Sequence, residues 1–125
     1  MLPPWLKNAT TSPAARFTHP TVPYRLLSGT TVANDWTGLT SGTLLHPIDV
    51  FEDGTTIEAG TTFEVWTGTR PAGTYSGNSC NNWTNDTATA PNGDVGVTGQ
   101  TNAGWSQVYM QFCNRTTLRV YCFEQ

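Results

Sequence analysis

Charged residues are scarce in this chain. Six Lys and Arg and nine Asp and Glu occur among 125 residues, and Lys7 is the single lysine. The net charge of −3 is spread without runs, so no basic patch is present for nucleic acid or an anionic membrane surface. No apolar run approaches the length of a membrane span. We therefore expect neither nucleic-acid binding nor membrane insertion.

Catalytic signatures are also missing. The two histidines, His19 and His46, each precede a proline, and no Gly-x-Ser-x-Gly, His-Glu-x-x-His or phosphate-binding loop occurs. Carboxylate pairs could be assembled from the nine acids, but any nine acids offer such pairs. We therefore expect that the protein is not an enzyme. The stretch Met1–Trp5 lacks the basic and apolar regions of a signal peptide, so export has to be inferred from other features.

Helix signals are nearly absent, which leaves strands and turns. The length predicts a single domain over residues 1–125. One short helical turn is expected near Ser12–Arg16, where Ser12 could cap and Pro13 could take the first helical position. The remaining pattern predicts a mostly β fold with long irregular loops and little helix.

The expected strands come from short alternating runs bounded by Gly and Pro. Residues 23–27 and 31–33 predict a small hairpin, and 62–66 a further strand, with Trp66 in the core. Residues 106–112 and 118–123 predict an antiparallel hairpin joined by 113–117. The segment 35–42 is expected to be loop or turn. Residues 74–104 are polar and long, which is typical of a functional or poorly ordered loop.

Several short motifs together resemble a bacterial domain family of unknown function that groups with the C-type-lectin and endostatin-like folds. The matching pieces include Arg16-Phe-Thr-His, Val32-Ala-Asn-Asp-Trp36, Val65-Trp-Thr-Gly-Thr69, Cys80-Asn-Asn-Trp-Thr84 and Tyr121-Cys-Phe-Glu-Gln125. The resemblance implies a C-type-lectin-like domain, secreted or displayed on the cell surface, that binds ligands through long loops. Such domains open with a strand and a cysteine-bearing helix, and we expect this chain to lack both.

The same resemblance implies how the three cysteines are used. Cys80 would pair with Cys113 across the polar segment. Cys122 would be left without its usual partner, because that partner lies on the missing helix. An exposed free thiol is unusual in an oxidising compartment. We therefore expect Cys122 to be either a mostly buried thiol, on one strand face with Leu118 and Val120, or bonded to another chain. An apolar groove should lie there, covered by a neighbouring subunit or an upstream segment.

Candidate ligand-binding residues lie in and beside the 74–104 segment. Its two tryptophans could stack on a sugar or anchor a protein partner, although core packing is the alternative for both. The candidates are Trp83, Asn85, Asp86, Asn92, Asp94 and Trp105.

Two further kinds of site are suggested by short motifs. Asp49, Glu52 and Asp53 form an acidic turn that could hold calcium, against the alternative of a solvated turn; otherwise we expect no cofactor. Asn-x-Ser/Thr sequons occur at Asn8, Asn82, Asn85 and Asn114. In a secreted glycoprotein these asparagines could carry glycans.

Two functions are consistent with these features. The first is an extracellular or cell-surface adhesion module that binds a glycan or an extracellular protein through the polar loop. The second is a structural subunit of a surface layer or filament, a homo-oligomer in which an unpaired sheet edge accepts another chain.

Overall fold

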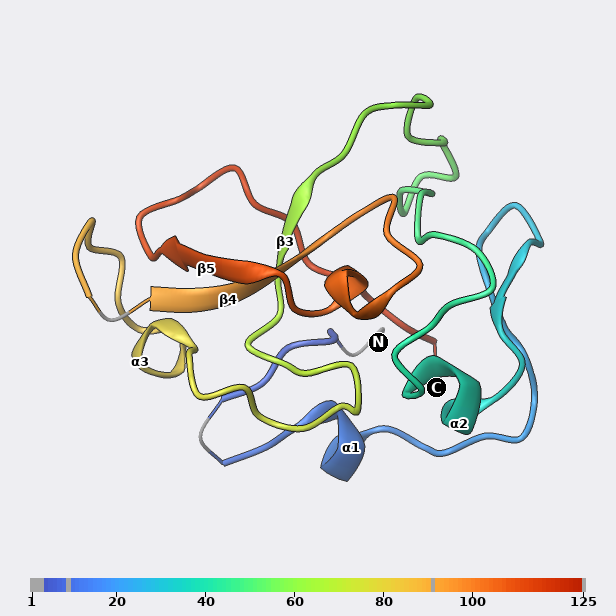
Figure 1. The fold of residues 1–125 in the computed structure, drawn as a ribbon, viewed down its shortest axis with the longest axis horizontal. Coiled ribbons are helices and arrows are strands. Elements are labelled where there is room, and N and C mark those ends of the chain that lie inside the picture. Colours follow the sequence, from blue (N-terminus) through green and yellow to red (C-terminus); the bar gives the residue numbers. More distant parts are fainter. Residues whose placement is uncertain (1–3, 9, 91, 125) are drawn as a thin grey trace.

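The computed structural model describes residues 4–8, 10–90 and 92–124. Its regular elements are short, and most of the chain between them is irregular (Figure 1). The elements are α1 (Pro13–Arg16), β1 (Tyr24–Arg25), β2 (Thr31–Ala33), α2 (Trp36–Leu39), β3 (Glu64–Trp66), α3 (Cys80–Trp83), β4 (Asn92–Val97), the 3-10 turn η1 (Ala103–Trp105) and β5 (Tyr109–Phe112). Small antiparallel sheets with little helix are thus confirmed.

Two separate sheets organise these strands. β3, β4 and β5 form an antiparallel sheet in that order, and β1 pairs with β2 on the opposite side of the molecule (Figure 1). The predicted hairpin of 23–27 with 31–33 is confirmed, as are the strand within 62–66 and the helical turn after Ser12. Ser12 makes no side-chain capping bond, so Pro13, which presets the helical φ, is the main start signal.

The predicted C-terminal hairpin is wrong. β5 pairs with β4, and Arg119 instead forms a parallel bridge with Val65 on the outer edge of β3. The alternating pattern of β5 is compatible with more than one antiparallel partner, so the pattern alone does not select one. In the structure β4 is that partner. After Cys113 the chain therefore crosses to the other edge of the sheet.

Two regions expected to be loops contain regular structure. Asp35 begins α2, because its Oδ1 accepts a hydrogen bond from the Gly38 amide at 2.7 Å. β4 runs through the polar segment although its sequence, Asn-Gly-Asp-Val-Gly-Val, is poor in strand formers. Gly96 explains part of this choice, since a Cβ there would lie 2.0 Å from the Trp105 carbonyl oxygen. Close backbone approach, rather than propensity, selects glycine at that position.

Aromatic side chains make the centre of the core. The Trp5 ring is fully buried and lies within 4.9–6.0 Å, centroid to centroid, of the rings of Phe17, Trp36, Trp105 and Phe123. Rings bury more area than other side chains, so a chain with few hydrophobic residues can still form a core around them. The predicted Trp66 is only partly buried and packs instead against Trp83 on the outer sheet face.

A buried polar network fastens this core to the sheet. Trp5 Nε1 donates to Ser106 Oγ at 2.8 Å, and Ser106 Oγ donates to the Thr69 carbonyl at 2.7 Å. Thr67 Oγ1 donates to the Ser106 carbonyl at 2.6 Å. Buried polar groups are tolerated when they are paired in this way, and the network fixes the N-terminal segment against residues a hundred positions away.

Candidate functional site

A left-handed turn lies in the middle of the polar segment. All four residues of α3 have positive φ, from 49° at Cys80 to 64° at Trp83. Non-glycine residues visit this region singly, at a cost of roughly 1–2 kcal/mol each, and asparagine tolerates it best. Asn81 and Asn82 occupy the two central positions. A run of four strained residues persists only where the surroundings hold it.

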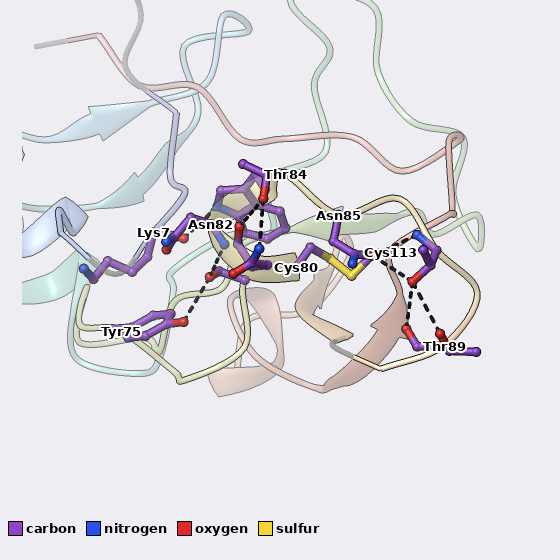
Figure 2. The surroundings of a disulfide bond; sticks show 12 residues. Lys7, Tyr75, Cys80, Asn82, Thr84, Asn85, Thr89 and Cys113 are labelled. Atoms are coloured by element: carbon purple, nitrogen blue, oxygen red, sulfur yellow. Dashed lines mark hydrogen bonds between the residues drawn. A yellow bond between two sulfur atoms is a disulfide. The ribbon is translucent and has the colours of Figure 1, made fainter.

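Two attachments hold the turn in place (Figure 2). Cys80 is bonded to Cys113, which confirms the predicted disulfide. At the other end Trp83 Nε1 donates to the Lys7 carbonyl at 2.7 Å, and its ring meets Trp66 edge to face at 5.6 Å. The turn is therefore tied by the disulfide to Cys113, the residue that follows β5, and by the Trp83 indole to the N-terminal segment.

The turn forms one wall of an open polar pocket of about 260 Å³. The segment before the turn forms a second wall and runs beside β4 through the Ser79–Gly93 bridge. The lining residues are Tyr75, Gly77, Asn78, Ser79, Asn81, Asn82 and Asn92. The lining carries no charged side chain, and four of its seven residues are asparagine.

Hydrogen bonds to neighbours set the orientation of two of these amides. Asn78 Nδ2 donates to Asp94 Oδ2 at 3.1 Å, and an ionised carboxylate can only accept, so the amide nitrogen must face it. Thr84 Oγ1 donates to the Asn81 carbonyl at 2.6 Å and accepts from Asn81 Nδ2 at 3.2 Å. Both amides are thereby anchored through nitrogen.

Tyr75 and Ser79 complete the lining. Their hydroxyls are 2.9 Å apart and share a hydrogen bond. The Lys7 ammonium lies over the Tyr75 ring, 4.9 Å from its centroid, and Figure 2 shows the two side chains together. This cation–π contact fixes the ring at the edge of the pocket.

The six candidate ligand-binding residues do not all lie at the pocket. Asn92 lines the pocket; Asp94 is 3% exposed and lies behind the lining; Trp83 braces the turn. Asn85 closes a turn by accepting from the Thr87 amide and hydroxyl, and Asp86 is exposed. For Trp105 the structure shows the core-packing alternative, because the ring is fully buried.

Five lining residues were missed: Tyr75, Gly77, Asn78, Ser79 and Asn81. Asn82 was singled out only as a sequon. Proximity to the disulfide was the one signal that could have found the turn residues. The remaining lining residues are brought in by the bridge to β4, which the sequence does not indicate.

The acidic turn at Asp49, Glu52 and Asp53 has no metal-binding geometry. Throughout residues 4–8, 10–90 and 92–124, no three His, Cys, Asp or Glu side chains gather as a metal-ligand cluster. Asp53 instead accepts hydrogen bonds from the hydroxyl and amide of Thr55, at 2.6 and 2.9 Å, which lower the pKa of its carboxyl. Calcium binding at this turn stays a prediction.

The sequon asparagines differ in their surroundings. Asn8 Oδ1 accepts hydrogen bonds from Thr10 and Thr11, and Asn82 lines the pocket. Asn114 is exposed in the turn that follows Cys113. Glycosylation at these positions stays a prediction.

Cys122 is exposed, so the prediction of a mostly buried thiol is wrong. The strand alternates as expected but with the opposite phase: Tyr121 and Phe123 are 5% and 8% exposed, whereas Val120 is 46% exposed. A shift of one residue reverses every side chain, and the two large rings gain more from burial than Val120 and Cys122 would. Pairing of Trp5 with Tyr121 through a 2.8 Å backbone bond fixes this phase.

Cys122 nevertheless lines a broad surface groove of about 1150 Å³, as expected for its surroundings. We name it the Cys122 groove. Much of its wall is apolar. The Arg119 guanidinium at this wall lies over the rings of Phe51 and Phe63, 4.7 and 4.6 Å from their centroids. Its apolar lining includes Leu26, Ile48, Val50, Ile57 and Val120.

The Cys122 thiol should react slowly with alkylating agents despite its exposure. Partial burial, and secondarily the Glu52 carboxylate, raise the pKa of the thiol, and the thiolate is the reactive form. Alkylation by iodoacetamide at about pH 8 should therefore be slower than for free cysteine and should still be rising beyond about pH 9. Intact-protein mass spectrometry across this range measures the rate. Glu52→Gln should speed the reaction, and a profile identical to free cysteine would contradict the assignment.

Comparison with known proteins gave no match: no family model, curated protein or solved structure aligns significantly with the chain. The lectin-like resemblance thus remains a prediction. Among the helices that the structure describes, none has the length and apolarity needed to cross a membrane.

Proposed function

We propose that this chain is an extracellular or cell-surface recognition module that binds a glycan or an extracellular protein through the segment 74–104. The observation that carries the proposal is the polar pocket built on the left-handed turn. The turn is strained, yet the Cys80–Cys113 bond and Trp83 hold it rigid. Backbone strain at a fixed polar surface is typical of binding sites, and a rigid surface lowers the ordering cost of binding.

Three observations support a lectin-like, secreted setting for this module. The Cys80–Cys113 pairing is the one the resemblance implies, and disulfides persist mainly outside the cytosol. The fold is mostly β with long loops. The Cys122 groove offers apolar surface where a neighbouring subunit or an upstream segment could pack. The proposal assigns the chain no catalytic role and no cofactor.

Binding measurements on a pocket variant test this function. The protein is screened against a glycan array and a panel of immobilised extracellular proteins, beside the triple variant Tyr75→Ala, Asn81→Gly, Asn92→Ala. The wild type should bind at least one class, and the triple variant should lose that binding. Leu45→Ser, at a residue 63% exposed and outside the pocket, is the matched control. Equal binding by the triple variant would remove the pocket from the function.

Assembly into a surface layer or filament is favoured by a different observation. β5 is an edge strand, and its Met110 and Phe112, together with Val108 just before it, are 46–51% exposed. Natural edges usually carry charges or proline that block pairing, and this one carries neither. Size-exclusion mass at tens of micromolar decides between the two functions, because a strict monomer argues against assembly.

A further inference from the structure

We infer that the pocket beside the left-handed turn takes a neutral, hydroxyl-rich ligand, one sugar unit of a glycan, and holds it without a metal ion. This inference rests on the proposed function and specifies its ligand chemistry.

The free polar atoms of the pocket are mainly acceptors. Asn78 and Asn81 each donate one N–H, to Asp94 and to Thr84 respectively, and their Oδ1 atoms accept no hydrogen bond within the described residues. Each of these amides thus has a protein partner on its donor side, and its acceptor side is left for a ligand. A ligand that satisfies them must bring O–H or N–H groups.

Asn92 supplies a third acceptor. Its Oδ1 is closed off from water and has no hydrogen-bond partner, which costs about 1–3 kcal/mol for a buried polar atom. The residue itself is only partly buried and lines the pocket, so rotation of its amide can present this oxygen to a bound hydroxyl. An unpaired acceptor of this kind calls for an explanation, and a donor supplied by a ligand is one.

The lining carries no charged side chain, which argues against a charged ligand. A sulfate, phosphate or carboxylate group would meet no cation there, since Lys7 lies over the Tyr75 ring and outside the lining. A calcium ion would need carboxylate ligands, and the neighbouring Asp94 is behind the lining, where it accepts from Asn78 and Gln107. A neutral polyol matches three uncharged acceptors without desolvating an ion.

The size of the pocket agrees with a small group. At about 260 Å³ it lies just below the range of roughly 300–1,000 Å³ typical of small-molecule sites. Tyr75, fixed by Lys7 and Ser79, offers a ring at its edge on which the apolar face of a sugar can pack.

Matched asparagine variants test the inference. Binding is screened on an array of neutral, sulfated and sialylated glycans in EDTA, and the methyl glycoside of the best neutral hit is then titrated. Asn81→Gly removes one acceptor and keeps the positive φ accessible, because glycine adopts it freely. Asn85→Gly makes the same change in the same segment outside the pocket. Asn81→Gly should weaken binding about three- to tenfold, the worth of one hydrogen bond, and Asn85→Gly should not.

Asn92→Ala gives an independent readout. It should weaken binding by a similar factor without lowering thermal stability, because it deletes an acceptor that has no partner in the free protein. A structural role for this amide would instead lower the melting temperature and leave affinity unchanged.

The outcomes separate this inference from the function it rests on. Binding that requires calcium, is confined to charged glycans, or is equally weakened by Asn81→Gly and Asn85→Gly would overturn the neutral-sugar site. If no glycan binds but a protein partner is lost in the triple variant, the recognition function stands and the sugar site falls. If neither class binds, both fall.

Discussion

Trp5→Ala is expected to lower the free energy of unfolding by about 3–5 kcal/mol, the usual cost of deleting a large buried ring. Trp5 is fully buried and contacts four other aromatic rings. Its loss would also leave Ser106 Oγ without the indole donor. Domains are stable by only about 5–15 kcal/mol, so the variant should be close to unfolding at room temperature.

Urea unfolding followed by circular dichroism measures this effect. Trp5→Phe is the informative control, because it keeps a ring in the cluster and removes only the indole bond and part of the volume. It should cost clearly less than Trp5→Ala. A loss below about 1 kcal/mol for Trp5→Ala would place Trp5 outside the core and contradict the described packing.

Removal of the Cys80–Cys113 bond is expected to destabilise the protein by about 3.5–4 kcal/mol. The two residues are separated by 33 positions, and the chain-entropy relation gives this value for a loop of that length. A local effect should accompany the global one. Without the bond, the link to Cys113 no longer keeps the turn in its positive-φ conformation, so residues 80–84 should become more mobile.

The double variant Cys80→Ala, Cys113→Ala tests both effects, with Cys122→Ser as the single-thiol control. Urea unfolding gives the stability, and amide hydrogen exchange of residues 80–84 reports the turn. The control should unfold like wild type, since Cys122 is exposed and forms no disulfide. Unchanged exchange in the double variant would show that Trp83 alone holds the turn.

Local patterns predicted the elements that local forces decide. The β1–β2 hairpin, the strand within 62–66 and the turn at Pro13 follow from residues that are adjacent in sequence. The Cys80–Cys113 bond was implied by resemblance rather than by physics.

The predictions that failed concern features decided by contacts between residues far apart in the sequence. β5 alternates well enough to pair with either neighbour, and only the three-dimensional arrangement selects β4. The phase of residues 120–123 depends on Trp5, which is more than a hundred positions away. For the pocket, Asn92 could be named from its place in a polar segment. Asn78 and Asn81 could not, because their roles depend on which amide atoms Asp94 and Thr84 engage.

The pairing of Trp5 with Tyr121 has a consequence for how the protein is made. The indole at the centre of the core is synthesised more than a hundred residues before Tyr121 and Phe123. Until these two residues clear the exit tunnel, Trp5 has no backbone partner at Tyr121, and Phe123 is missing from the rings around it. The nascent chain must therefore carry Trp5 unburied, within reach of chaperones, and the core closes only once residues 121–123 have emerged.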